Sequence, residues 1–328
     1  MSPANPEPAR KLVTVFGGSG FIGRYVVGAL ARQGWRLRVG VRQPHLAHHL
    51  QPLGTVGQIM PVQANVRYPD SLAAACIGAD AVINLVAILY NAGAQKFDTV
   101  NAAGAGTVAE AARNAGARRL VHVSAIGADP DSTADYARSK AEGEANARAA
   151  FGDAMIVRPS IVFGPEDAFF NRFAGIARLS PALPLIGGGH TRFQPVYAGD
   201  VAEGIARLLT LDAAAGKTYE FGGPETFTFR ELMEFMLHAI QRRRLLIPLP
   251  WSVAKLQAAV LQLLPKPLLT MDQVELLKSD NVVSEAAIEA GLTLEGLGMT
   301  PQGIDAIVPA YLVHFRRAGQ FTPPDAER

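Results

Sequence analysis

Cysteine is almost absent from this 328-residue chain, in which Cys76 is the only one. A lone cysteine excludes an internal disulfide and is typical of a reducing compartment, and its alanine-rich surroundings predict a buried thiol. Long apolar runs are also missing, since no segment approaches the roughly 20 residues that span a bilayer. The first ten residues have neither the apolar core of a signal peptide nor the composition of a transit segment. These absences predict a soluble, cytoplasmic protein.

Charge of one sign is not concentrated anywhere in the chain. The 31 Lys and Arg and the 29 Asp and Glu leave a formal net charge of +2, and the basic residues are scattered. Nucleic acid is therefore not expected as a partner. His45, His48 and His49 lie close together, but no cysteine or acidic cluster joins them, so no metal site is expected. Hydrophobic residues at 49% and charged residues at 18% exclude a disordered chain.

The first half of the chain alternates short apolar runs with helical patterns, which is typical of βαβ units. We predict an α/β fold, with a Rossmann-type doubly wound parallel sheet whose central strands are apolar because helices cover both faces. The strands are predicted at residues 12–16, 36–41, 57–63, 81–86, 119–124 and 155–159, and the helices at 21–32, 69–75, 97–115 and 132–149.

The pattern changes beyond Gly164, where helices dominate and proline and glycine become more frequent. We therefore predict a Rossmann domain at residues 1–164, to which later segments are free to add strands, and a smaller, mainly helical C-terminal lobe at residues 165–328. Two pairs with capping-box spacing predict helix starts in this lobe, namely Asp200 with Glu203 and Thr228 with Glu231.

A glycine-rich loop joins the first predicted strand to the first predicted helix. Here Gly17 permits a tight turn, Gly20 lets the backbone approach a pyrophosphate, and Gly23 lets the helix pack closely on the strand. The phosphates would lie at the positive end of the helix. The whole loop is therefore predicted to bind a dinucleotide, which makes residues 1–164 an NAD(P)-binding domain: Gly17, Gly18, Ser19, Gly20, Phe21, Ile22 and Gly23.

The end of the second strand distinguishes the two nicotinamide cofactors. NAD-specific proteins carry an acid about 20 residues after the glycine loop, but this strand ends in Arg42 with no Asp or Glu. A guanidinium pairs well with a 2′-phosphate, which predicts NADPH rather than NADH, and Arg38 on the same strand face is expected to help. Ligands of such sheets lie beyond the carboxyl ends of the strands, so four more residues are predicted to meet the cofactor: Asn65, Val66, Val86 and Ala87.

Tyr136 and Lys140 lie four residues apart in a predicted helix and therefore share one face. A neighbouring ammonium favours the tyrosinate, so we expect Lys140 to lower the pKa of Tyr136 from about 10. The tyrosine can then exchange a proton with a carbonyl or hydroxyl group while the nicotinamide exchanges a hydride. Lys140 can also bind the nicotinamide ribose, and Ser124 at the end of the fifth strand can polarise the reacting oxygen. These three residues are the predicted catalytic group.

Together these motifs resemble those of the extended and atypical short-chain dehydrogenases. The resemblance covers residues 12–232 and includes the glycine loop, the Tyr136/Lys140 pair and the stretches at 158–165 and 194–202. It implies further cofactor contacts at Pro159, Ser160 and Ile161. The chain departs from the extended enzymes at Ala125, where they usually have a second Ser or Thr.

More narrowly, the chain resembles the branch that contains the NADPH-binding accessory subunit of respiratory complex I and its bacterial relatives. The supporting stretches are residues 122–129, 136–144 and 269–277. The resemblance implies an NADPH held structurally, complex I subunits as partners and a peripheral position on the cytoplasmic face of the inner membrane. The intact Tyr136/Lys140 pair leaves an alternative open, a free NADP-dependent oxidoreductase or epimerase with a small-molecule substrate. Whether the chain itself turns over a substrate is left open.

An apolar segment with basic flanks occupies residues 248–267 of the predicted C-terminal lobe. Its leucines and valines repeat at helical spacing. This pattern is typical of an amphipathic helix that lies on a membrane surface or a partner. It is equally typical of a helix that packs its apolar stripe onto the core. Both interpretations stay open at this point.

Overall fold

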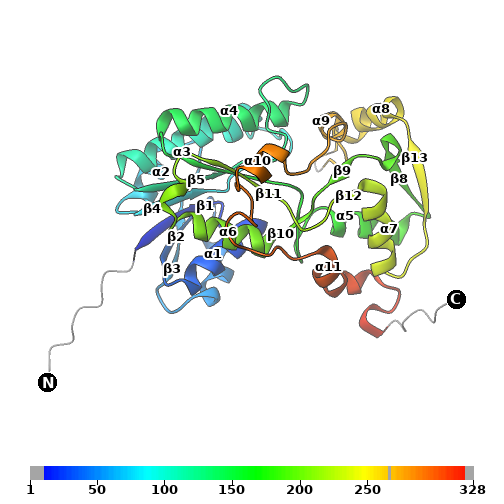
Figure 1. Cartoon of the computed structure of the whole chain (residues 1–328), viewed down its shortest axis with the longest axis horizontal. Coiled ribbons are helices and arrows are strands. Elements are labelled where there is room, and N and C mark those ends of the chain that lie inside the picture. Colours follow the sequence, from blue (N-terminus) through cyan, green and yellow to red (C-terminus); the bar gives the residue numbers. More distant parts are fainter. Residues whose placement is uncertain (1–10, 265–266, 322–328) are drawn as a thin grey trace. The chain divides into compact units, whose positions relative to one another are not determined.

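Seven strands form the main sheet of the protein, whose computed structural model describes residues 11–264 and 267–321. Their order across the sheet is β11-β6-β5-β4-β1-β2-β3 (Figure 1), and every pairing from β3 to β6 is parallel. The predictions that concern residues 1–10 and 265–266 lie outside the described residues. The strand bounds are β1 Leu12–Phe16, β2 Arg36–Val41, β3 Ile59–Gln63, β4 Ala81–Asn84, β5 Arg119–Val123, β6 Met155–Pro159 and β11 Thr218–Phe221.

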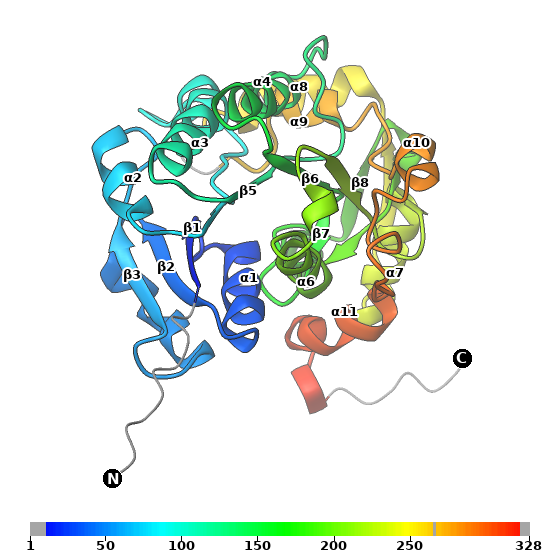
Figure 2. The same cartoon turned by 60° about the vertical axis from the view of Figure 1, so that its left-hand side comes forward.

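Helices cover both faces of this sheet (Figure 2). Helices α1 and α6 lie on one face, and α2, α3 and α4 lie on the other. All four residues of β4 are buried, as expected for a strand that is covered on both sides. The predicted Rossmann-type α/β fold is thus confirmed. The helix bounds are α1 Phe21–Arg32, α2 Pro69–Cys76, α3 Ala103–Asn114, α4 Asp135–Ala150 and α6 Ala198–Leu208.

The ends of some elements differ from the prediction. Strand β3 begins two residues late because Gly57, with a φ of +75°, belongs to a turn. The helix predicted at residues 97–115 begins as a π-helical turn, η2 (Asp98–Ala102), before α3 continues it. Such turns are frequent at functional sites.

Of the two predicted capping boxes, one is confirmed and one is wrong. Thr228 caps α7 (Phe229–Ala239) by accepting from the Glu231 amide, and the Glu231 side chain bonds back. Helix α6 begins at Ala198, so Asp200 lies inside its first turn. The Asp200 carboxylate instead accepts a hydrogen bond of 2.7 Å from the Gln302 amide, a partner about a hundred residues away.

The chain divides into two compact units. Unit 1 contains the described residues up to Ser124 together with Ser139–Val157 and Val201–Tyr219, and unit 2 contains the others. The core of unit 1 lies between the sheet and helices α2, α3 and α4, and includes Leu72 and Leu120. Cys76 is buried there, as predicted, and burial raises the pKa of its thiol to about 11.

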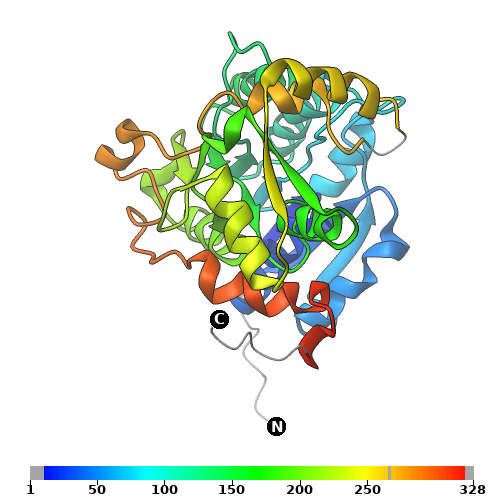
Figure 3. The ribbon, with the colours of Figure 1, turned by 90° about the vertical axis from the view of Figure 1, so that its right-hand side faces the viewer.

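Unit 2 is built around a cluster of phenylalanines. Helices α5 (Phe170–Leu179), α7 and α11 (Ile304–Leu312) enclose these rings, many of which meet edge to face. Strands β8 (Ala182–Ile186) and β13 (Leu245–Leu249) form a parallel pair, and β13 leads into α8 (Trp251–Leu261) and α9 (Met271–Leu276) (Figure 3). The short elements are β7 Val162–Phe163, β9 Arg192–Phe193, β10 Val196–Tyr197, β12 Phe227–Thr228 and α10 Glu285–Glu289.

Among the residues that the structure describes, no helix is both long and apolar enough to cross a bilayer.

Candidate functional site

The loop after β1 has the backbone that a phosphate cradle needs. Gly17 has a φ of +80°, in the left-handed region that favours glycine. At Gly23 an added Cβ would lie 2.3 Å from the Gly17 carbonyl oxygen, which is too close for any side chain. At Gly20 an added Cβ would meet only that same oxygen, at 3.2 Å, so this side of the loop is open. The loop therefore has the tight turn and the close packing predicted from its glycines.

Helix α1 starts on this loop without a protein cap. Its N-cap residue, Gly20, offers no side chain, and the first turn contains no acidic residue. The first amides of a helix lack intrahelical acceptors and carry a partial positive charge. An anionic phosphate would satisfy both. The loop also lies where the strand order reverses, between β1 and β4, which is where open α/β sheets bind their ligands.

The side chains of Arg42 and Arg38 have different hydrogen-bond partners, although both residues come from the region of β2. Arg42 follows β2 and is exposed, with its Nη1 donating to the Gln95 Oε1 at 3.1 Å. The Arg38 Nη1 donates instead to the carbonyl oxygens of Ala75 and Ile77 at the end of α2, at 2.7 and 2.8 Å. The expectation that Arg38 helps to bind the cofactor is therefore wrong, because its guanidinium is committed to the C-terminus of α2.

Residues 85–88, here called the β4 strap, are held by two buried asparagines. The Asn84 Oδ1 accepts from the Val86 amide at 3.1 Å. Asn101, in η2, binds both backbone groups of Ile88, accepting at 2.9 Å and donating at 3.2 Å. An added Cβ at Gly17 would contact this strap at 3.2 Å. The strap is thus fixed directly beside the glycine loop.

The end of β3 contributes a polar side chain near the same edge of the sheet. Asn65 is half-buried, and its Oδ1 accepts from the Arg67 amide at 3.1 Å. Val66 is buried, and Gly104 of α3 packs against it so closely that an added Cβ would lie 3.2 Å away. Both residues follow a strand carboxyl end, as predicted.

Lys140 is buried beside the end of β5. Its Nζ donates to the Val123 carbonyl oxygen at 2.8 Å. Burial lowers the pKa of Lys140 to about 8, against the opposing effect of the Glu144 carboxylate. Ser124 is also buried, and its hydroxyl has no hydrogen-bond partner among the described residues. A buried hydroxyl without a partner calls for an explanation, and a ligand supplies one.

His122 forms a second buried polar group in this region. Its Nδ1 lies 3.2 Å from the Asn84 Nδ2, whereas its buried Nε2 lacks a partner within the described part of the chain. Burial, and then the charge of Lys140, hold the pKa of His122 well below its usual range. Both effects favour the neutral imidazole. The Asn84 amide can donate to its Nδ1, and Asn84 in turn orients the β4 strap.

Tyr136 lies one helical turn before Lys140 in α4 and is half-buried. The prediction that Lys140 lowers the pKa of Tyr136 is wrong in this structure. Burial and the Asp272 carboxylate instead raise the pKa of Tyr136 to about 12. Asp272 comes from α9 and accepts from the amides of Asp135 and Tyr136, at 2.5 and 3.1 Å. It thereby caps the start of α4, which places a negative charge beside the tyrosine.

The segment Pro159–Ile161 of unit 2 is held by one asparagine. The Asn281 Oδ1 accepts from the Ser160 hydroxyl at 2.8 Å and from the Ile161 amide at 3.0 Å. The Asn281 Nδ2 donates to the Ile126 carbonyl oxygen at 3.2 Å. One side chain thus fixes two backbone segments that follow strands β5 and β6.

Residues 13–222 match the sequence model of the NAD dependent epimerase/dehydratase family. This match spans more than half of the chain. The chain belongs to that family. In fold it is similar to the dTDP-glucose 4,6-dehydratase DesIV from Streptomyces venezuelae, solved with NAD and TYD bound. The TM-score is 0.69 at 22% identity, over 92% of this chain and 95% of that one.

The similarity to two relatives extends beyond the matched segment. A mitochondrial protein of Arabidopsis thaliana, NADH dehydrogenase [ubiquinone] 1 alpha subcomplex subunit 9, is 35% identical over 320 residues, which is 94% of this chain and 79% of that protein. The ceramide reductase of Caulobacter vibrioides is 32% identical over 242 residues, 74% of each protein. The chain is therefore similar both to complex I subunits and to a reductase.

Four polar residues that fix the backbone around the candidate site were not predicted from the sequence. They are buried or capping side chains whose partners lie far away in the chain: Asn84, Asn101, His122 and Asp272. A weak signal existed for three of them. A polar residue that interrupts or ends an otherwise apolar strand, or that begins a helix after one, is costly to bury unless it has a partner. Nothing near Asp272 in the sequence indicates that it caps α4.

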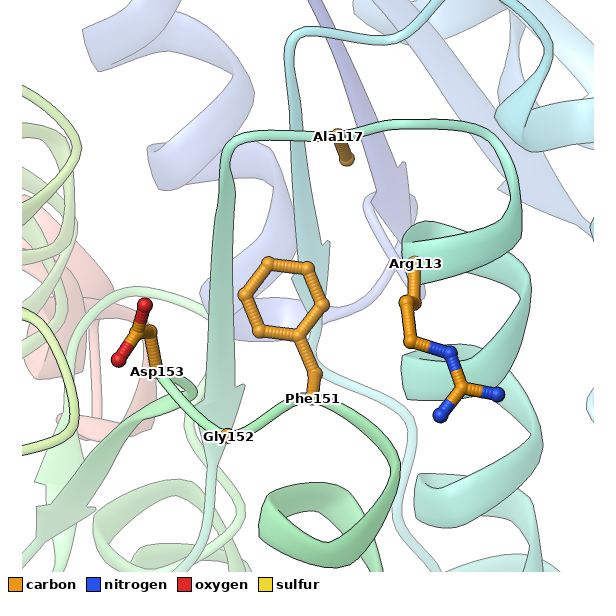
Figure 4. A pocket seen from close by; sticks show the side chains of 5 residues that line it. All are labelled: Arg113, Ala117, Phe151, Gly152 and Asp153. Atoms are coloured by element: carbon orange, nitrogen blue, oxygen red, sulfur yellow. The ribbon is translucent and has the colours of Figure 1, made fainter.

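A surface hollow of unit 1 lies at the other edge of the sheet (Figure 4). It is lined by residues that precede strands β5 and β6, namely Arg113, Ala117, Phe151, Gly152 and Asp153. The Arg113 guanidinium donates to the Ala150 carbonyl oxygen at 3.0 Å. Because ligands of this family's sheet lie beyond the carboxyl ends of the strands, this hollow is not part of the candidate site.

Proposed function

We propose that this chain is an NADPH-binding accessory subunit of bacterial respiratory complex I (NADH:quinone oxidoreductase), peripheral on the cytoplasmic face of the inner membrane. The observation that carries the proposal is the similarity to the Arabidopsis complex I subunit along 94% of this chain. The intact glycine loop supports a bound nucleotide. In this role NADPH is a structural element, and complex I subunits are the partners.

The residues of unit 1 fit such a nucleotide. The uncapped start of α1 would receive the pyrophosphate. Arg42 would pair with the 2′-phosphate, and Asn65 and Val66 would lie beside the adenine. The β4 strap would flank the nicotinamide half, and the Lys140 ammonium would bind its ribose hydroxyls in place of the Val123 carbonyl. From unit 2 we assign further contacts to Tyr136, Pro159, Ser160 and Ile161.

Native co-purification tests the subunit assignment. The tagged protein is expressed in its own host at its natural level, and the membranes are solubilised gently. We expect stoichiometric recovery of complex I subunits, with NADPH retained in the preparation. An unrelated membrane-peripheral protein carrying the same tag serves as the control. Recovery as a free protein without complex I would overturn the assignment.

Arg42→Ala tests the choice of NADPH. Loss of a charge-assisted contact to the 2′-phosphate weakens NADPH binding roughly ten- to hundredfold and leaves NADH binding unchanged. Arg38→Ala is the matched control. It removes two bonds at the end of α2, so it lowers stability by about 1–2 kcal/mol without changing the NADPH/NADH ratio. Titration of the intrinsic fluorescence with NADPH and with NADH measures the two affinities in each variant. An unchanged ratio in Arg42→Ala contradicts the assignment.

A second candidate function is a free NADP-dependent reductase, which the similarity to ceramide reductase favours. Bound NADPH would supply a hydride to a carbonyl carbon. Tyr136 would donate its proton to the carbonyl oxygen, and the Ser124 hydroxyl would hold that oxygen. The raised pKa of Tyr136 keeps its hydroxyl protonated, which is the form that a proton donor needs. In this case Tyr136→Phe lowers turnover by orders of magnitude and, because it keeps the aromatic ring, weakens NADPH binding only slightly, whereas an accessory subunit tolerates the same change in complex I assembly.

A further inference from the structure

Helix α8 exposes its large apolar side chains, whereas a helix that packs on a core buries them. The residues it buries are alanines, Ala254 and Ala258. The large aliphatic residues point outward, with Leu256 70% and Val260 63% exposed and Val253 exposed as well. Their spacing of three and four places them on one stripe of the helix. The ordinary alternative, an apolar stripe packed onto the core, is therefore wrong for this helix.

The exposed apolar surface continues on both sides of α8. Leu263, 80% exposed, and Leu264 follow the helix in the turn after it. Before the helix, Leu245 and Ile247 alternate outward along β13, with Leu245 69% exposed. Figure 3 shows β13 in yellow running toward α8 in gold. We call these exposed residues of β13, α8 and the following turn the α8 face.

The charge of the surrounding segment has one sign. Between Glu234 and Asp272 the chain contains no acidic residue and five Arg and Lys residues. Three of these, Arg242–Arg244, directly precede β13. The carboxylate of Glu275 in α9 forms an ion pair with the ammonium of Lys255 in α8, at 2.5 Å. It forms a second one with the ammonium of Lys278, at 2.6 Å. This trio keeps a net positive charge.

The arginines before β13 belong to a larger positive cluster. Partial burial, and then Arg244, Arg317 and Arg178, lower the pKa of Arg242. The Arg242 and Arg244 Nε groups donate to neutral backbone carbonyls, those of Phe315 and Ala177, at 2.8 and 2.7 Å. These bonds orient the guanidinium groups without cancelling their charge. The positive cluster therefore lies next to the β13 end of the α8 face.

We propose that the α8 face docks on the surface of an anionic lipid bilayer. Exposed aliphatic side chains would enter the boundary between headgroups and acyl chains, and the neighbouring arginines would pair with lipid phosphates. Protein interfaces are richer in aromatic residues and carry mixed charges, whereas the exposed large residues here are aliphatic and the segment lacks acids. The inference rests on the membrane location in the proposed function and gives that location a physical site.

Vesicle flotation with the purified full-length protein tests the inference. The vesicles are phosphatidylcholine alone or phosphatidylcholine with phosphatidylglycerol. We expect binding to the anionic vesicles that weakens with salt. The double variant L256Q/V260Q lowers vesicle affinity about tenfold or more, because two aliphatic side chains no longer leave water. Arg243→Glu, at an exposed position, lowers affinity for anionic vesicles about tenfold.

Ile288→Gln is the matched control, because Ile288 is 60% exposed in α10 and lies outside both the α8 face and the positive cluster. Circular dichroism of every variant verifies folding. A wild-type protein that ignores anionic vesicles, or a control as damaging as the double variant, overturns the inference. Co-purification with complex I but no vesicle binding means that the α8 face docks on protein, so the lipid inference fails while the proposed function stands. Vesicle binding without co-purification of complex I supports the lipid inference and overturns the proposed function.

Discussion

Gly23→Ala is expected to abolish NADPH binding and to lower the free energy of unfolding by about 1–3 kcal/mol, the usual cost of overpacking a close contact. The added Cβ would lie 2.3 Å from the Gly17 oxygen and 2.6 Å from the Gly18 backbone. Backbone atoms cannot move aside as a flexible side chain can. Helix α1 must therefore shift away from β1, which also displaces the amides that would hold the pyrophosphate.

Gly20→Ala is the informative comparison. Its Cβ would contact only the Gly17 oxygen, at 3.2 Å, and otherwise face open space. We expect this variant to fold with near-normal stability and to bind NADPH more weakly, because the methyl group occupies the path of the phosphates. Chemical denaturation and nucleotide titration of both variants separate the two effects. Equal loss of stability in the two variants would contradict this account of the loop.

Lys140→Met is expected to weaken NADPH binding about tenfold or more, since charge-assisted hydrogen bonds to the ribose are lost. It should also remove a pH dependence. Burial lowers the pKa of Lys140 to about 8, whereas its ordinary value is 10.5. Ribose hydroxyls that accept from the ammonium favour the protonated form. The affinity of the wild-type protein for NADPH therefore falls as the pH rises through about 8, and that of the variant stays flat.

The stability of the free protein has the opposite dependence. Between pH 8 and 10.5 the unfolded chain holds a proton on Lys140 that the folded chain has lost, so unfolding takes up a proton. The wild-type free energy of unfolding should accordingly gain a positive contribution as the pH rises through this window. Lys140→Met lacks that contribution. Denaturation of both proteins at several pH values measures the difference, and parallel curves would show that Lys140 is not the titrating group.

The sequence by itself determined six of the seven strands of the sheet and the position of the glycine loop, whereas β11 joins the sheet from a distant part of the chain. Both depend on neighbours in the chain: apolar runs that alternate with helical patterns, and glycines at a strand-to-helix turn. The positions of Arg42, Asn65 and Val86 at strand ends follow for the same reason. A parallel sheet brings the carboxyl ends of successive strands to one edge, so the strand pattern alone predicts that these residues lie there.

The use of each polar side chain was decided by the tertiary structure. Arg38 and Arg42 carry the same guanidinium, yet α2 lies within reach of only the first. The pKa of Tyr136 rises because the ring is buried and because Asp272, distant in the chain, caps the helix that carries the tyrosine. The exposed aliphatic residues of α8, Val253, Leu256 and Val260, have the spacing of a core-packing stripe, and only the burial of Ala254 and Ala258 turns them outward. Periodicity depends on residues a few positions apart, whereas burial and charge depend on which distant residues meet, and no local pattern contains that information.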